Sequence, residues 1–268
     1  MEIQQYLVEK DLNVFKRFAS TGSKASFDNK LKYLTKIAEQ EKWFFENDSG
    51  EDFSVIFYYI IHTFDQVFKQ NKITINDDKT KAVFNTGLLT DLGYEIYGLF
   101  EKNTHFDGEL GKSNYWHFKS FVTENERAFT EIDINKPKMA TFFTDYNELY
   151  FNPDKEIEIN FDHIYDDNFD RLPEELQSLE KTVAKQVFDG ALKHTILRIK
   201  RNNRIPVPQI YNDSVMFLIP VKVLGTKTVV IAVEEQGKVY RANTILTMSM
   251  AYNCARLLTR PESNWLLI

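Results

Sequence analysis

The stretch LQSLEKTVAKQVFDGALKHTILRIKRN occupies residues 176–202 and predicts the longest helix of the chain. Small and apolar side chains recur along one side of it at helical spacing. They are Ala184, Val187, Phe188, Ala191, Thr195 and Ile199. The pattern then changes, because residues 214–223 (SVMFLIPVKV) and 228–235 (TVVIAVEE) are apolar runs of strand length. A long helix beside such strands predicts an α+β fold.

The same two patterns extend toward both ends of the chain. Helical spacing predicts helices over 27–47 and 53–70, so the N-terminal part, 1–72, is expected to be helical and to pack on a mixed, mostly antiparallel sheet. The remaining predictions are strands over 81–86, 94–101, 115–122, 138–143, 148–152, 238–241 and 244–248, an irregular acidic segment over 153–174, and a short helix capped by Ser249. We expect one structural unit, 1–268, in which residues 73–268 form the α+β part.

Composition excludes several classes of protein. The 268 residues are 43% hydrophobic, which supports a substantial core and excludes wholesale disorder. The single cysteine, Cys254, excludes a disulfide framework and a multi-cysteine metal site, and it fits a reducing cytoplasm. The N-terminus lacks the apolar core of a signal peptide. No apolar run approaches the roughly 20 residues of a membrane span, so a cytoplasmic protein without membrane contact is expected.

Charge is distributed unevenly along the chain. The net charge is −6, but residues 181–268 hold 13 Lys and Arg against 5 Asp and Glu, whereas residues 1–180 hold 20 against 34. The contrast between a basic C-terminal third and an acidic remainder indicates that only one part of the molecule binds a polyanion. The alternative is that the two parts attract one another.

The cations of the long helix fall into two groups by helical position. His194, Arg198 and Arg201 form a stripe at the border between the apolar side and water, where a partly desolvated cation binds phosphate or carboxylate strongly. Three further cations lie on the solvated side, namely Lys193, Lys200 and Arg204. The alternative interpretation is an ordinary helix end whose cations match the helix dipole.

The helix leaves through NNRIPVPQIY, residues 202–211, a proline-stiffened segment that presents Gln209 and Tyr211. The last predicted helix carries Tyr252, Asn253 and Arg256. If the two helices are adjacent, these side chains and Arg198 form an anion pocket. Cys254 lies in an apolar run of that helix and is expected to be buried and inert.

No cofactor or metal site is predicted. GELGKS, residues 108–113, lacks the first glycine of a phosphate-binding loop. Two weak groupings of metal-ligand residue types remain as alternatives. One is His105, Asp107 and His117, and the other is Asp162, His163, Asp166 and Asp167.

Several motifs together carry a family resemblance. They are FNTGL (84–88), IYGLFEKN (96–103), HIYDDNFDRLP (163–173), RNNRIPVPQIY (201–211), FLIP (217–220) and TILTMSMAYNCARLLTRPESNWL (244–266). From about residue 28 onward the chain resembles the bacterial family of the domain of unknown function 3825. Members of that family look like partners of RNA-binding modules, so the resemblance implies an RNA-linked role by association, through this domain or through a partner RNA-binding protein.

Three functions are therefore compared. The first is an RNA-binding or RNA-processing protein, with a basic groove of Lys193, His194, Arg198, Lys200, Arg201 and Arg204 and with Tyr211 and Trp265 as stacking surfaces. If it is a ribonuclease, we expect metal-independent catalysis with His194 or His163 as the base and Arg198 or Arg256 stabilising the charge.

The second is a pocket enzyme or sensor for a small nucleotide, with Arg198, Asn253 and Arg256 as a phosphate clamp. The third is a non-catalytic interaction protein whose charge asymmetry drives homo-oligomer formation. The sequence leaves open whether the protein is an enzyme.

Overall fold

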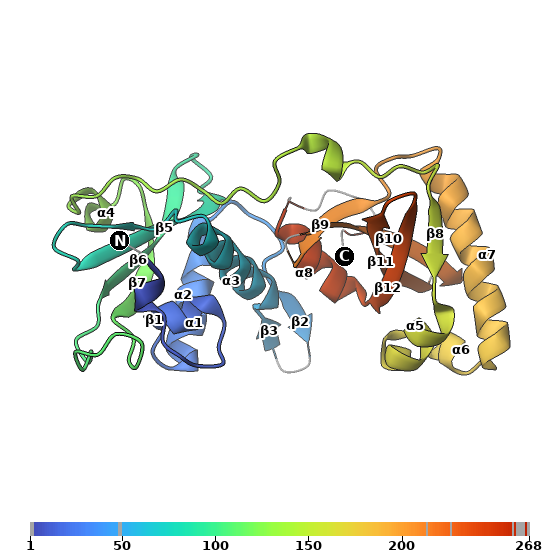
Figure 1. Ribbon diagram of the computed structural model, residues 1–268, viewed down its shortest axis with the longest axis horizontal. Coiled ribbons are helices and arrows are strands. Elements are labelled where there is room, and N and C mark those ends of the chain that lie inside the picture. The colour runs from blue at the N-terminus through green and yellow to red at the C-terminus, as the bar shows by residue number, and fades with distance from the viewer. Residues whose placement is uncertain are drawn as a thin grey trace. The chain divides into compact units, whose positions relative to one another are not determined.

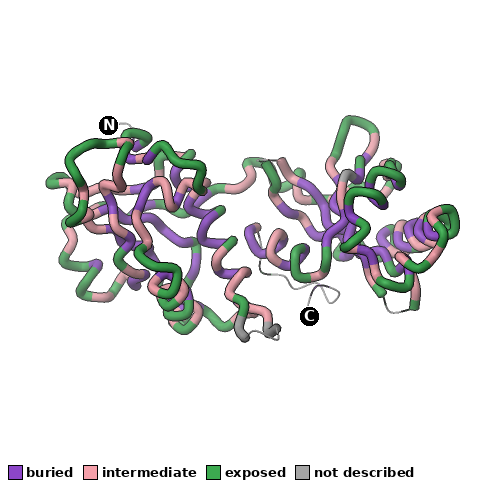
Figure 2. Tube along the Cα trace, turned by 90° about the horizontal axis from the view of Figure 1, so that it is seen from below, coloured by how far each residue is buried: buried purple, intermediate pink, exposed green. Residues whose placement is uncertain are grey.

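The computed structural model describes residues 3–47, 50–212, 214–225, 227–258, 260 and 266. The chain forms two compact units, residues 1–141 and 142–268, each built around a mixed five-stranded sheet (Figure 1). This is the α+β fold class that the sequence predicts. The contacts divide the chain near residue 141, whereas we expected one unit with an internal division near residue 72. Buried positions gather inside each unit, and exposed ones follow the loops (Figure 2).

The sheet of the first unit has the strand order β1-β7-β6-β5-β4. Its strands are β1 (Ala19–Ser20), β4 (Thr74–Ile75), β5 (Lys81–Leu89), β6 (Glu95–Lys102) and β7 (Trp116–Thr123). Neighbours are antiparallel except β1 and β7, which are parallel. The strands predicted over 81–86, 94–101 and 115–122 are confirmed.

Helices of the first unit pack on this sheet through an aromatic core. The elements outside the sheet are η1 (Ile3–Tyr6), α1 (Val14–Phe18), α2 (Lys24–Ile37), the hairpin β2 (Phe45–Asn47) and β3 (Gly50–Asp52), α3 (Ser54–Lys69) and α4 (Arg127–Thr130). The ring of Phe15 on α1 lies 4.8 Å from that of Phe64 on α3 and 5.1 Å from that of Phe118 on β7. Burying each ring contributes about 1.5–3 kcal/mol, so these aromatics are the reason that the N-terminal helices stay on the sheet.

The helix predicted over 27–47 is shorter than expected and begins earlier. Ser23 caps α2 by accepting a hydrogen bond from the Ser26 backbone N–H, at 3.2 Å. The helix ends at Ile37, and the Glu39 N–H donates to the Leu89 carbonyl of β5 at 2.9 Å. Because the Glu39 N–H is bonded to the end of β5, it is not available for the next helical hydrogen bond, and the helix ends. The helix predicted over 53–70 is confirmed by α3.

The sheet of the second unit has the order β8-β12-β11-β10-β9. Its strands are β8 (Glu156–Ile159), β9 (Val207–Tyr211), β10 (Ser214–Leu224), β11 (Lys227–Gln236) and β12 (Val239–Leu246). Only the pairing of β12 with β8 is parallel in this sheet. The two short strands predicted over 238–241 and 244–248 form the single strand β12, whose pairing with β11 contains a register shift.

Two helices cover opposite faces of this second sheet (Figure 1). On one face lies α7 (Lys181–Ile199), whose Phe188 shares a buried cluster with Phe217 and Ile219 of β10. On the other lies α8 (Met248–Arg256), which contacts β9, β11 and β12. Side chains alternate along a strand, so Met216 and Leu218 point toward the α8 face.

Three local predictions for residues 138–174 are wrong. Residues 138–143 and 148–152 form no strands, and the short helix η2 (Tyr146–Leu149) runs into the second of these ranges. The segment 153–174 is not irregular, because it contains β8, α5 (Phe161–Asp167) and η3 (Phe169–Arg171). Phe161, Ile164 and Tyr165 join the core, an apolar signal that the many acidic residues around them obscure.

Two helix boundaries also differ from prediction. The helix over 176–202 is interrupted, since Glu180 is extended between α6 (Glu174–Gln177) and α7. The last helix is capped by Thr247 rather than Ser249, with the Thr247 hydroxyl accepting from the Met250 N–H at 3.3 Å.

Candidate functional site

The first half of α7 carries lysines that are paired with carboxylates. Lys181 Nζ lies 2.8 Å from Asp166 and 3.2 Å from Asp162, both on α5. The hydrogen bond that Lys181 donates to Asp166 raises the pKa of Lys181 above its usual value. Lys185 lies 2.9 Å from Asp189, one helical turn further on. The charge of this half is therefore locally neutralised.

The second half of α7 and the two residues after it are different, and we call them the basic end. Its members are Lys193, His194, Arg198, Lys200 and Arg201. Arg198 is half-buried, as predicted for the border stripe, and the other four are exposed. The border position predicted for His194 and Arg201 is therefore wrong, because both side chains lie on the solvated side. Among the described residues, Lys193, Arg198 and Arg201 form no ion pair, whereas Lys200 lies 3.4 Å from Asp154.

The loop after the basic end leads into the edge strand β9. Arg204 is exposed, and its backbone N–H donates to Asn202 Oδ1 at 3.1 Å. Gln209 is only 3% exposed, and its Oε1 has no hydrogen-bond partner among the described residues. Tyr211 is 62% exposed. Gln209 pairs with Met216, so Gln209 and Tyr211 belong to the α8 face of the sheet and not to the face that carries α7.

The residues predicted on the last helix lie on that same α8 face. Tyr252 and Arg256 are buried and Asn253 is half-buried, and α8 packs beside β9. Arg198 and Arg256 are therefore separated by the sheet, and the anion pocket that required adjacent helices does not form with Arg198. The sequence contains no signal for this separation, because it depends on which sheet face each helix covers. Trp265 lies outside the described residues.

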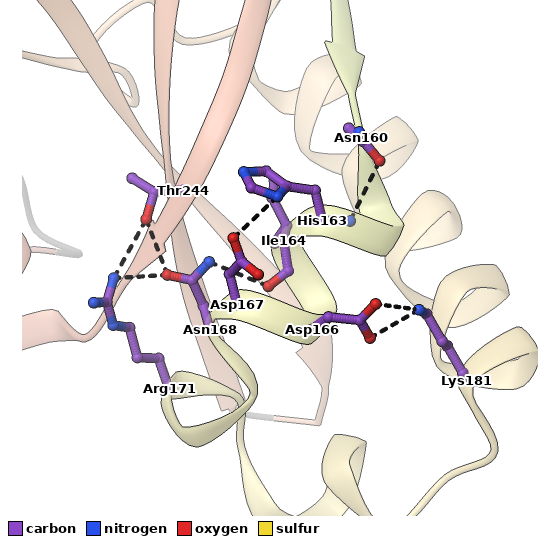
Figure 3. Close-up of polar contacts among 9 residues, drawn as sticks. All are labelled: Asn160, His163, Ile164, Asp166, Asp167, Asn168, Arg171, Lys181 and Thr244. Atoms are coloured by element: carbon purple, nitrogen blue, oxygen red, sulfur yellow. Dashed lines mark hydrogen bonds and ion pairs between the residues drawn. The ribbon is translucent and has the colours of Figure 1, made fainter.

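His163 belongs to a second polar group, on α5 (Figure 3). Asn160 Oδ1 caps this helix by accepting from the His163 N–H at 3.3 Å. His163 Nδ1 lies 3.0 Å from Asp167 Oδ2, and both side chains are exposed. A carboxylate at Nδ1 orients the imidazole and favours the tautomer in which Nε2 can accept a proton. The i, i+4 spacing of the two residues in the sequence could have indicated this pair.

His163 and the basic end nevertheless lie at opposite ends of α7. Lys181 binds α5, and Arg198 lies 17 residues further along the helix, which corresponds to about 26 Å at 1.5 Å per residue. His163 and Arg198 therefore do not act on one phosphate. His194 precedes Arg198 by four residues, so of the two candidate bases only His194 shares a helix face with Arg198.

A partly buried hydrogen-bond network beside His163 was not predicted (Figure 3). Asn168 Oδ1 accepts from Arg171 Nη1 at 2.7 Å and from Thr244 Oγ1 at 3.1 Å. Arg171 Nη1 also donates to the Ile245 carbonyl at 3.0 Å, and Asn168 Nδ2 donates to the Ile164 carbonyl at 3.2 Å. We call Asn168, Arg171 and Thr244 the α5 latch, because they fasten the end of α5 to β12.

Metal-binding clusters and membrane-spanning helices are both absent from the described part of the chain. In it, no three His, Cys, Asp or Glu side chains lie close enough together to hold a metal ion. None of its helices combines the length and the apolarity that crossing a bilayer requires.

Comparison with known proteins places the chain in a family. Searches of curated proteins and of solved structures gave no significant match. A family model does match, over residues 34–265, and its description is Domain of unknown function (DUF3825). The match includes strands β2 to β12, α5 with its latch, the basic end and the whole of α8. Since these residues make up most of the chain, the protein belongs to the DUF3825 family.

Proposed function

We propose that the protein binds single-stranded RNA through the basic end of α7. The observation that carries the proposal is the contrast within one helix. Lys181 and Lys185 are matched by carboxylates, whereas Lys193, Arg198 and Arg201 have no ion pair among the described residues. A polyanion would supply the missing negative charge.

The local environment of the basic end suits a phosphate group. Arg198 is half-buried, so its guanidinium is partly shielded from water and its attraction for an anion is stronger than that of a fully solvated lysine. The guanidinium can also donate two parallel hydrogen bonds to one phosphate. Leu197 is 52% exposed beside it and offers an apolar surface to an unpaired base.

RNA processing extends this proposal. His194 lies one turn from Arg198. His194 would take the proton of the ribose 2′-hydroxyl as that oxygen bonds to the adjacent phosphorus, and would return it to the 5′-oxygen as the phosphorus–oxygen bond to that leaving group breaks. Arg198 would stabilise the charge on the phosphate. This mechanism needs no metal ion. His163 is oriented by Asp167 but is remote from the basic end, so we assign it no part in this reaction.

Binding of a fluorescent single-stranded RNA, measured by anisotropy, tests the proposal. We expect Arg198→Ala to weaken binding by about 10-fold or more, the effect of losing a charge-assisted hydrogen bond. Lys200→Ala is the matched control, because Lys200 lies at the same end but is exposed and 3.4 Å from Asp154. Duplex DNA should bind less tightly than the RNA. Absent RNA binding at low salt, equal binding of duplex DNA, or a larger loss for Lys200→Ala would contradict the proposal.

A small-nucleotide site on the α8 face is the second candidate. It is favoured by Gln209, whose buried Oε1 has no described partner and could accept a hydrogen bond from a nucleobase N–H. Tyr252, Asn253 and Arg256 lie on the helix that packs beside β9, so they would supply the remaining contacts without Arg198. Isothermal calorimetry with mononucleotides should then show binding that Gln209→Leu removes and that Arg198→Ala leaves unchanged. Binding unaffected by Gln209→Leu would exclude this site.

A further inference from the structure

One face of the first unit's sheet is covered along only part of its length. Phe129 of α4 packs with Val83, Tyr97, Leu99 and Val122, and Ile132 and Ile134 complete this cover. Beyond it, Lys81, Glu101 and His117 are in register across β5, β6 and β7. None of these three side chains is buried. Polar groups from three strands are thus placed side by side on an open surface.

We call this surface the open sheet patch, and its strand residues are Lys81, Glu101, His117 and Lys119. Lys30 reaches the margin of the patch at β7 from α2, which packs on the opposite face of the sheet. Glu101 accepts a hydrogen bond from Lys81 and lies 3.2 Å from Lys119. Burial alone would raise the pKa of Glu101, but the two lysines hold it below its usual value, so the carboxylate is ionised. Two lysines share this one glutamate, which leaves positive charge in excess.

Lys30 adds a charge that no described carboxylate matches. It extends from α2, and its Nζ donates to the Phe118 carbonyl at 2.6 Å. Desolvation, and then repulsion from Lys119, lowers the pKa of Lys30. Desolvation also lowers the pKa of His117, followed by repulsion from Lys30 and Lys119, with Glu101 acting in the opposite direction. Each of these cations disfavours the protonated form of its neighbours, and a bound anion would offset that repulsion.

We propose that the open sheet patch binds the phosphate group of a nucleotide, either as part of an RNA strand or as a free nucleotide. Lys119 is more than half exposed, so it can meet a phosphate directly. Lys30 keeps donor hydrogens beyond the one used by Phe118, and protonated His117 would donate from its ring. This site lies in the first unit and is independent of the basic end of α7.

The ring protons of His117 give a direct readout by nuclear magnetic resonance. The full chain is titrated with pH alone, with inorganic phosphate, with adenosine monophosphate and with a short single-stranded RNA. Charged and titratable groups that act on His117 are Lys30, Lys119, Glu101 and His105. Because a phosphate favours the protonated imidazole, ligand should raise the pKa of His117. By linkage, binding should tighten as pH falls through that pKa.

Substitutions separate the patch from an unspecific surface effect. We expect Lys119→Ala to weaken ligand binding about fivefold, as for an exposed charge contact, and His117→Gln to remove the pH dependence. Lys36→Ala is the control, because Lys36 is an exposed lysine of α2 outside the patch. Since Lys30 also bonds the backbone, Lys30→Arg should retain binding and thereby separate lost charge from lost folding.

The outcomes distinguish this inference from the proposed function. If the mononucleotide and RNA saturate the shift of the His117 resonances at similar concentrations, the patch is supported and a free nucleotide is a sufficient ligand. Much tighter saturation by RNA supports the patch and identifies the strand. Suppose that RNA binding depends on Arg198, but that no ligand shifts the His117 resonances and Lys119→Ala weakens the binding of none. The patch is then overturned and RNA binding stands. If His117 responds while RNA binding is absent, the patch stands and the proposed function fails.

Discussion

Gly98 lies in β6 directly opposite Phe84 of β5. A Cβ at position 98 would come within 2.0 Å of the Phe84 ring, and Phe84 is fully buried, so it cannot move aside freely. We expect Gly98→Ala to lower the free energy of unfolding by about 1–3 kcal/mol, the usual cost of overpacking a core. The measurement is denaturant unfolding followed by circular dichroism.

At Gly190, substitution by alanine is expected to have the opposite effect on the free energy of unfolding. Gly190 lies within α7, and a Cβ there would meet nothing within 4 Å. Gly190→Ala should raise the free energy of unfolding by about 0.4–1 kcal/mol, because alanine restricts the unfolded chain and favours helix. Equal effects of the two substitutions would contradict this account of the two positions.

Cys254 is the third residue for which the structure makes a definite prediction. Cys254 is half-buried rather than fully buried as expected, and desolvation raises the pKa of its thiol to about 11. The thiolate, which is the reactive form, is therefore scarce at neutral pH. Alkylation by iodoacetamide should be slow in the folded protein and should become fast in denaturant. Cys254→Ser should change stability while RNA binding per folded molecule stays intact. Rapid modification of the native protein, or lost binding at unchanged melting temperature, would identify Cys254 as functional.

At the scale of elements, the α5 latch is the feature most open to test. Arg171→Met would leave Asn168 Oδ1 and the Ile245 carbonyl without this donor, and unfolding should become easier by about 1–3 kcal/mol. Arg241→Met is the matched control, since Arg241 forms an exposed ion pair with Glu158 at 3.1 Å, worth less than about 1 kcal/mol. A loss for Arg241→Met as large as that for Arg171→Met would show that the latch contributes no special stability.

Some of these elements can be predicted from local sequence patterns, and others cannot. Apolar runs such as 228–235 predict strands correctly because both faces of β11 are buried. Helical spacing predicts the buried side of α7, where Ala184, Phe188, Thr195 and Ile199 are covered. The end of α2 was mispredicted because it depends on the carbonyl of Leu89, a residue of a distant strand.

The candidate site was predicted in part for the same reason. The border position of Arg198 follows from helical geometry, and the structure confirms it. The separation of Arg198 from Arg256 depends on the sheet between α7 and α8, and a local pattern contains no information about it. The contacts of Thr244 with Asn168 and Arg171 likewise join residues about 75 positions apart, too far for spacing rules to indicate.

At the scale of the whole molecule, the RNA-processing proposal predicts a reaction without a metal ion. If the protein cleaves RNA, EDTA should leave the rate unchanged, and His194→Ala should abolish turnover while sparing most of the binding. His163→Ala should leave turnover intact, because His163 lies at the other end of α7. Electrophoresis of labelled RNA, with elemental analysis for zinc, provides the measurement. Loss of cleavage on chelation, or one zinc ion per chain, would contradict this mechanism.

The salt dependence of RNA binding tests the central claim most directly. For single strands, each phosphate neutralised contributes about 0.7 to the slope of log K against log salt concentration. The basic end offers Lys193, Arg198 and Arg201, so replacing Arg198 and Arg201 by alanine together should reduce the slope by about 1.4. Replacing the paired Lys181 and Lys185 together, an equal change in charge, should leave the slope nearly unchanged. Equal slopes for the wild type and the Arg198 and Arg201 variant, or an equal reduction in the control, would contradict RNA binding by the basic end.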